Sequence, residues 1–274
     1  MKRDKEFDFG NNSVAEAYEN YLVPILFEPW AVKLTEAYGS WRGKQVIDLA
    51  AGTGVVTKRL QQLVSPDGKV TAIDINSQML DIAKKNCPEE KGSVSFIEGD
   101  AASIDVSDNS IDVVVCQQGF QFFPDKKGAA EEIYRVLKQN GDAVISCWCP
   151  VSDCKFFGAI CNALELMGEN EISDMMRIPF DLMPAEELSN YFKSANFKNV
   201  VVSIIELDMI LTENIGSVVD LAYSTPIGPK LMALGENQQK EFQSNLINQI
   251  SNISRKRDNL WPMASLLLSA RKLA

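Results

Sequence analysis

The sequence predicts an α/β fold in which a seven-stranded, mostly parallel sheet carries helices on both faces. From residue 44 onward, short β-branched segments alternate with segments of helical spacing, which is typical of βαβ units around a buried parallel sheet. The 274-residue chain is 46% hydrophobic and 23% charged, so it can bury a large core. A glycine-rich turn follows the first strand, as at the ligand edge of such sheets.

Five strands and their crossover helices are predicted between residues 44 and 149. The predicted strands occupy residues 45–49, 69–74, 93–97, 111–116 and 143–148. Helical spacing predicts helices at 53–63 and 77–86, and a third that starts at Pro124 and stops before Asn140-Gly141. A helix over 185–194, a strand within 200–207 and a last strand at 264–270 complete the sheet.

Three stretches lie outside this alternation. Residues 12–40 have the pattern of two helices interrupted at Pro24 and Pro29, and 151–183 and 212–258 have the pattern of helical insertions. The predicted organisation is an N-terminal helical lid (1–40), a ligand-binding core (41–150), a helical cap (151–183), a core helix and strand (184–211), a second cap segment (212–258) and a final core strand (259–274). Six methionines within 151–235 fit either an ordinary helical core or an adaptable substrate pocket.

Composition excludes several function classes. The formal net charge of −10 repels polyphosphate, so nucleic acid is an unexpected partner. No apolar stretch approaches the roughly 18 residues of a membrane span, and the charged N-terminus is unlike a secretory signal, which predicts a cytoplasmic protein. The six cysteines are then expected to be free and buried. Because the chain has no His and no zinc-type spacing, no metal is predicted.

The chemistry of the predicted site starts at the first strand, which ends at Asp48-Leu49 and turns through Ala50-Ala51-Gly52-Thr53-Gly54. A dinucleotide fingerprint would place a third small residue where the chain has Thr57. Asp48 favours a ligand with positive charge instead. Asp74 ends the second strand 20 residues beyond Gly54, where an acid can accept both ribose hydroxyls.

The third strand is followed by Glu98-Gly99-Asp100-Ala101-Ala102. This segment offers a carboxylate to an exocyclic amine and small residues to flank a purine ring. These three strand ends together predict an adenosine-like ligand that lacks a pyrophosphate.

These motifs resemble those of the class I S-adenosylmethionine-dependent methyltransferases, which have a Rossmann-like fold. Segments 117–125 and 134–141 are similar to those of small-molecule enzymes related to the ubiquinone/menaquinone C-methyltransferases. The resemblance covers about residues 12–150 well and the C-terminal part more loosely. One departure is Ala50, because the family usually has Gly there.

The resemblance implies S-adenosylmethionine as cofactor, with S-adenosylhomocysteine as product, and a small-molecule methyl acceptor. Asp48, Ala50, Gly52 and the backbone of Gln117 would hold the methionine end, Asp74 the ribose, and the remaining positions the adenosine or the lid. The full set of predicted cofactor residues is Tyr18, Asp48, Ala50, Gly52, Thr53, Gly54, Asp74, Ile75, Met79, Asp100, Ala101 and Gln117. The predicted acceptor contacts are Gln118, Gln121, Phe122 and Trp148, whose aromatic members fit a core role equally well.

In-line methyl transfer needs mainly geometry and a dry site, so no dedicated base is obligatory. The strand end Cys116-Gln117-Gln118 offers no Mg²⁺ ligands. An apolar or aromatic small molecule is the expected acceptor. Two alternatives stay open: a protein of this fold that uses the cofactor for a non-methylating reaction, and a cofactor-binding regulatory or partner subunit.

Overall fold

The computed structural model describes residues 18–88, 93–210, 215–254 and 260–273. The chain divides into two compact units. The sheet unit comprises residues 27–148, 183–205 and 265–274, and the helical unit comprises 1–26, 149–182 and 206–264. The long strands β6 and β7 contribute residues to both units.

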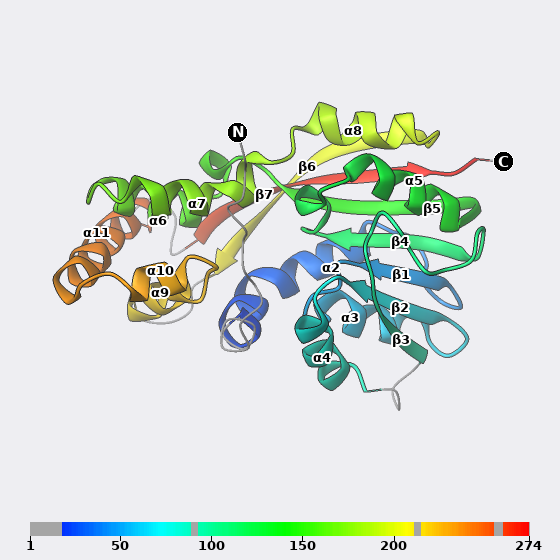
Figure 1. The fold of residues 1–274 in the computed structure, drawn as a ribbon, viewed down its shortest axis with the longest axis horizontal. Coiled ribbons are helices and arrows are strands. Elements are labelled where there is room, and N and C mark those ends of the chain that lie inside the picture. The colour runs from blue at the N-terminus through cyan, green and yellow to red at the C-terminus, as the bar shows by residue number, and fades with distance from the viewer. Residues whose placement is uncertain (1–17, 89–92, 211–214, 255–259, 274) are drawn as a thin grey trace. The chain divides into compact units, whose positions relative to one another are not determined.

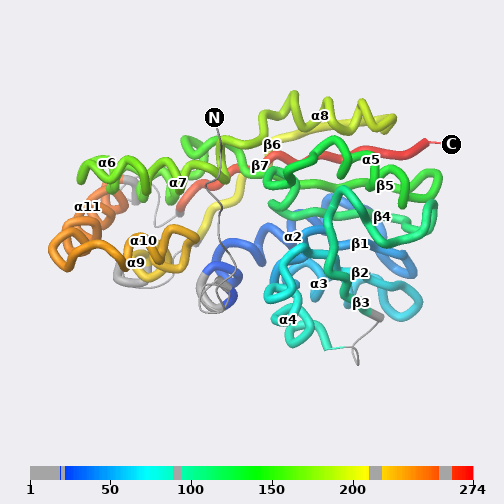
Figure 2. The backbone as a smooth tube through the Cα atoms, in the orientation of Figure 1, coloured from blue at the N-terminus to red at the C-terminus, as the bar shows by residue number. Residues whose placement is uncertain are grey.

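The predicted seven-stranded sheet is confirmed (Figure 1). Its strands are β1 (Gln45–Leu49), β2 (Lys69–Asp74), β3 (Ser93–Glu98), β4 (Ile111–Gln117), β5 (Leu137–Trp148), β6 (Lys198–Ile210) and β7 (Leu260–Arg271). They lie in the order β3-β2-β1-β4-β5-β7-β6. Pairs among the first five strands are parallel, whereas β7 runs antiparallel to β5. Figure 2 shows the red trace of β7 between β5 and β6.

The helices of the sheet unit include α2 (Glu28–Glu36), α3 (Val55–Val64), α4 (Ser77–Asn86), α5 (Lys126–Val136) and α8 (Ala185–Ser194). Two of them begin at side-chain caps. Asn76 Oδ1 accepts from Gln78 N at 3.0 Å and Met79 N at 3.2 Å, and Asp125 Oδ1 accepts from Gly128 N at 2.8 Å. Such caps satisfy backbone donors that lack partners within the helix, so the sequence determines where these crossover helices start.

Helices α2 and α3 bury their apolar stripes against one face of the sheet. Ala31 and Leu34 of α2 and Leu60 of α3 belong to a cluster with valines from the inner strands. On the other face, α5 packs against β5 and α8. Helix α2 lies within the segment predicted as a lid, yet its apolar side forms part of the sheet unit's core.

The helical unit contains residues 151–182 of the first predicted insertion and the described residues of the second, and these are mainly helical. Its elements include the π-helix η1 (Tyr18–Phe27, whose last residue falls in the sheet unit), the short turn η4 (Val151–Asp153), α6 (Lys155–Glu165), α7 (Asn170–Asp181), α9 (Ile215–Tyr223), α10 (Gly228–Met232) and α11 (Glu236–Ser254). Helices α6, α7 and α11 pack together. Met176, Met183 and Met209 are buried, whereas Met232 is exposed.

The six cysteines are free and buried, as predicted. Burial raises the pKa of Cys116 to about 12, so this thiol stays protonated near neutral pH. Within the described ranges, no helix has both the length and the apolar character to cross a membrane. Nor does that part of the chain contain a group of three acidic or cysteine side chains placed to hold a metal ion.

Candidate active site

In the turn after β1, every second residue from 50 to 54 has a left-handed backbone conformation. Ala50, Gly52 and Gly54 have φ of 58°, 55° and 89°. A Cβ on Gly54 would lie 3.0 Å from the Cβ of Ala83 in α4, so Gly54 allows α3 and α4 to approach closely. A Cβ on Gly52 would meet nothing within 4 Å, which leaves open space beside the backbone at the carboxyl edge of the sheet.

Asp74 ends β2 and holds this turn. Its Oδ2 accepts a hydrogen bond from Gly52 N at 2.8 Å, and its Oδ1 accepts one from Asn76 N at 2.9 Å. Burial raises the pKa of the carboxyl group, and the backbone hydrogen bonds act in the opposite direction. A carboxylate has about four acceptor positions, so Asp74 can hold the loop through its backbone hydrogen bonds and still accept from the ribose.

Asp48 lies beneath the turn and is only 1% exposed. Its Oδ2 accepts from Thr57 Oγ1 of α3 at 2.5 Å. Burial raises the pKa of Asp48 to about 7; the Thr57 hydrogen bond lowers it and the charge of Asp74 raises it further. A buried carboxyl group with this pKa gains from a cation nearby.

On the purine side, Ile75 follows Asp74 and is 69% exposed, an unusual position for a large apolar side chain. Met79 and Ala101 are buried, and Asp100 is exposed. Asp100 Oδ1 accepts from Ala102 N at 2.9 Å, which shapes the turn after β3. Ile75 therefore offers an apolar surface to a purine ring. The loop of Asp100 follows β3, which pairs with β2 in parallel, so both loops lie at the same edge of the sheet.

One face of α5 holds the loop after β3. Gly128, Glu132 and Arg135 follow the i, i+4, i+7 spacing of a helix face. A Cβ on Gly128 would lie 3.2 Å from the Cβ of Ala102. Glu132 Oε2 accepts from Ile104 N at 2.8 Å, and Arg135 donates to Glu132 and to the carbonyl of Ile104 at 2.7 Å.

Arg135 also donates to the carbonyl of Val106 at 2.8 Å and to Asp108 at 2.6 Å. The loop that carries Asp100 and Ala101 is thus attached to α5 along its length.

The end of β4 presents two glutamines. Gln117 Nε2 donates to the carbonyl of Phe27 at 3.1 Å, and Gln118 Nε2 donates to Ser265 Oγ of β7 at 3.0 Å. The amide oxygens of both side chains are buried without a hydrogen-bond partner. Gln118 has a φ of 55°, and the next residue, Gly119, lies against the glycine turn: its Cβ would be 2.4 Å from that of Ala50.

The other predicted acceptor residues have different surroundings. Gln121 is fully buried, and its Oε1 accepts from Trp148 N at 2.8 Å. Phe122 is half-buried. Trp148 packs edge-on against Trp30 with ring centroids 5.4 Å apart, and against Phe27 at 6.2 Å. Their contact with an acceptor stays a prediction. The side chain of Tyr18 lies outside the described part of the structure.

Unpartnered buried polar atoms gather at this edge. In the described chain, the set includes Thr53 Oγ1 in the glycine turn, Gln117 Oε1 and Gln118 Oε1 at the end of β4, and Ser146 Oγ in the neighbouring β5. Buried polar groups normally have partners, so such a concentration indicates groups that serve a ligand. With the space at Gly52, Asp74 and exposed Ile75, these residues fit a nucleoside that carries a cationic tail.

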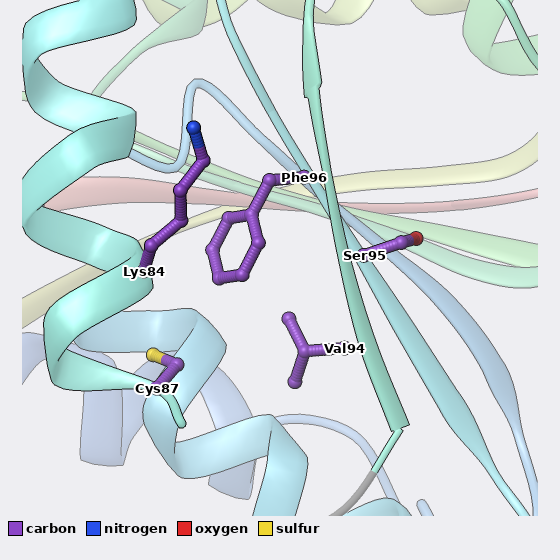
Figure 3. Close-up of a pocket in the computed structure, with 5 residues that line it drawn as sticks. All are labelled: Lys84, Cys87, Val94, Ser95 and Phe96. Carbon is purple, nitrogen blue, oxygen red and sulfur yellow. The ribbon is translucent and has the colours of Figure 1, made fainter. Parts of the chain in front are cut away.

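A concavity of the sheet unit lies away from these residues. It measures about 450 Å³ and is lined by residues from α4 and β3, namely Lys84, Cys87, Val94, Ser95 and Phe96. Figure 3 shows Val94 and Phe96 pointing toward α4, and Ser95 pointing away. None of the predicted site residues lines it, and the segment that joins α4 to β3 includes residues outside the described ranges. We therefore place the candidate site at the carboxyl edge.

Several residues of the site were not predicted. Thr57 donates a hydrogen bond to Asp48, whereas in the sequence it serves only as evidence against a dinucleotide site. Ser265 accepts a hydrogen bond from Gln118, 147 residues away in the sequence. Arg135 donates one to the carbonyl of Ile104, 31 residues away. The spacing of Glu132 and Arg135 on one helix face was a detectable signal for the contact of Arg135. No local pattern indicates the contact between Ser265 and Gln118.

Comparison with known proteins identifies the family. Residues 46–141 match the family described as "Methyltransferase domain". A demethylmenaquinone methyltransferase of Staphylococcus aureus is 30% identical over 208 residues, 72% of this chain and 83% of that protein. One of Lactococcus lactis is 35% identical over 137 residues, and the match spans about half of that protein (54%) and 48% of this chain.

Among solved structures, phosphoethanolamine N-methyltransferase 2 of Haemonchus contortus, in complex with phosphomonomethylethanolamine and S-adenosylhomocysteine, has a TM-score of 0.60 at 17% identity. The match covers 96% of this chain and 58% of that one, and it shows a shared fold.

The chain belongs to the class I S-adenosylmethionine-dependent methyltransferases. Within that family it is similar to the demethylmenaquinone methyltransferases. Its cofactor is S-adenosylmethionine, and the glycine turn, Asp48 and Asp74 are the described residues whose geometry fits that molecule.

Proposed function

We propose that the protein transfers the methyl group of S-adenosylmethionine to a small, apolar or aromatic molecule. The observation that carries this proposal is the convergence of the open glycine turn with Asp74, whose carboxylate accepts from the Gly52 amide. Bound there, the cofactor supplies an electrophilic methyl group on a sulfonium. The named acceptor of the bacterial relatives, demethylmenaquinone, is a reasonable model for the substrate class.

The proposed cofactor contacts are the twelve residues predicted from the sequence. Asp48 would stabilise the positive charge of the methionine end from below the turn, since its carboxyl group is buried and accepts its side-chain hydrogen bond from the neutral Thr57 hydroxyl. Asp74 would accept from the ribose, and Ile75 would cover one side of the purine. Gln118, Gln121, Phe122 and Trp148 are the proposed acceptor contacts.

The helical insertions and the N-terminal segment are proposed to enclose the acceptor. Methionine-bearing helices suit apolar ligands of varied shape, and enclosure keeps water from the reacting atoms. The net charge of −10 supports a small-molecule acceptor over nucleic acid. We also propose a cytoplasmic location and a reaction without a metal.

The experiment follows a labelled methyl group. The purified chain is incubated with methyl-labelled S-adenosylmethionine and an extract of small metabolites, and the products are separated by mass. We expect label in an apolar product and a matching yield of S-adenosylhomocysteine. Label that stays in the cofactor, despite tight binding, would favour the non-methylating or regulatory alternatives. RNA and DNA serve as comparison acceptors, and neither should gain label.

A further inference from the structure

The two glutamines at the end of β4 carry amides whose orientation the surrounding chain determines. A carbonyl oxygen can only accept, so the contact with Phe27 O requires the NH₂ group of Gln117. Ser265 Oγ donates its one hydrogen to the carbonyl of Cys147 at 2.8 Å or that of Leu266 at 3.1 Å. It can therefore only accept from Gln118, which places the NH₂ group of Gln118 toward Ser265.

This arrangement leaves the oxygen of Gln118 as an acceptor with no donor. The side chain is 5% exposed and its Oε1 has no hydrogen-bond partner. A buried amide oxygen without a donor is costly. Gln121 differs, because its oxygen already accepts from Trp148 N. Among the predicted acceptor contacts, Gln118 is the one whose polar group is both oriented and unused.

The position of Gln118 connects this oxygen to the cofactor turn. The residue follows the last residue of β4, and its backbone N–H donates to the carbonyl of Ser146 at 2.9 Å. Gly119 lies against Ala50 of the turn that would hold the methionine end. The oxygen therefore belongs to the segment that passes directly beside the cofactor turn.

We propose that Gln118 selects methyl acceptors that donate a hydrogen bond, such as a hydroxyl or amine, and rejects ethers and carboxylates of the same size. The inference rests on the proposed function. A matched donor would satisfy the buried oxygen, an ether would leave it unpaired, and a carboxylate would place negative charge against it. Because the oxygen is screened from water, the penalty for a wrong group is not relieved by solvent.

The test measures binding of four naphthalene probes to the full chain saturated with S-adenosylhomocysteine: 1-naphthol, 1-naphthylamine, 1-methoxynaphthalene and 1-naphthoate. We expect the first two to bind about tenfold more tightly than the last two. Gln118→Met should bring the four affinities together. Gln118→Glu, which keeps an acceptor oxygen, should retain the preference for donors.

The control is Gln61→Met, because Gln61 is another buried glutamine whose amide donates to the Pro88 carbonyl at 2.9 Å. This variant should keep the wild-type order of affinities. Equal binding of naphthol and its methyl ether, no binding of any probe, or an unchanged order in Gln118→Met would contradict the inference. Failure of S-adenosylhomocysteine itself to bind would contradict the proposed function instead.

Discussion

Asp48 and Asp74 end neighbouring parallel strands, yet they have different partners. Asp48 is bonded by the Thr57 hydroxyl beneath the turn, and Asp74 is bonded by backbone N–H groups of the turn itself. Asp74 is therefore both a ribose acceptor in our proposal and a support for the glycine turn. This double role changes what its replacement should do.

Asp74→Asn should weaken binding of S-adenosylhomocysteine by about 2 kcal/mol, because an amide replaces charge-assisted acceptors. It should also lower the free energy of unfolding, since one of the bonds to Gly52 N and Asn76 N is lost. Calorimetric titration and denaturant unfolding measure the two effects. Asp81→Asn is the control, because exposed Asp81 pairs with Lys84 on the surface of α4 at 3.0 Å. Unchanged affinity in Asp74→Asn would remove Asp74 from the site.

Asp48 should make stability depend on pH. Its pKa of about 7 in the folded chain lies above the unfolded value of about 3.9, so the folded state binds more protons between these values. The contribution of protonated Asp48 to the free energy of unfolding is fully present below about pH 4 and is lost as the pH rises through 7. The test measures the free energy of unfolding of the wild type and of Asp48→Asn across pH 5–8. As the pH rises, the wild type should lose stability relative to the variant. A difference independent of pH would contradict the assignment.

At the scale of elements, the turns after β1 and β4 share one small space. Ala50 has a left-handed φ of 58°, and a Cβ on Gly119 would lie 2.4 Å from its Cβ and 3.0 Å from Cys116 Sγ. Gly119 itself has ordinary helical angles, φ −102° and ψ −42°. The restriction on residue 119 is therefore crowding and not backbone strain.

Gly119→Ala should lower the free energy of unfolding by about 1–3 kcal/mol through overpacking. Ala50→Gly alone should be tolerated, since glycine adopts a left-handed φ readily. The double variant should lose less unfolding free energy than the two single variants added together, because the contact with the Cβ of residue 50 is gone. The contact with Cys116 Sγ remains, so the loss should not be fully relieved. A double-mutant cycle of unfolding free energies measures this coupling, and strict additivity would refute the shared space.

Helix α5 is expected to position the loop after β3. Arg135→Met removes donors to Glu132, Asp108 and two loop carbonyls, so it should weaken S-adenosylhomocysteine binding several-fold as well as lower stability by about 1–3 kcal/mol. Arg271→Met is the matched control, because Arg271 pairs with Asp142 at 2.6 Å on an exposed strand end. If both variants bind the ligand equally well, the loop does not depend on α5.

The agreement between sequence and structure follows the range of the interactions involved. The helices at 77–86 and 185–194 match α4 and α8, because a local cap and a local apolar period define them. Strand β5 starts at Leu137, six residues before its prediction. Leu137 pairs with Ile111 of β4, and the regular register resumes at Asp142 after an irregularity. The positions of Asp48, Asp74 and Gln117 at the ends of strands were predictable, whereas the hydrogen-bond partners of Gln118 and Asp48 depend on how the segments pack together.

For the whole molecule, we expect metal removal to have no effect. The chain has no His, and its cysteines are buried, with the pKa of Cys154 raised to about 12 by burial, so they are poor ligands. Methyl transfer after treatment with EDTA should equal that of the untreated protein. Loss of turnover that Mg²⁺ or Zn²⁺ restores would show that a metal takes part.

The position of β7 has a consequence for how the chain folds as it is synthesised. This strand is the last to leave the ribosome, yet it lies between β5 and β6, so β6 has no neighbour on that side until residues 260–271 have emerged. Domains generally begin to fold from the N-terminus during synthesis. A nascent chain stalled at residue 259 should therefore contain a protease-resistant sheet through β5 while residues 198–205 remain sensitive, and release of the last segment should protect both together.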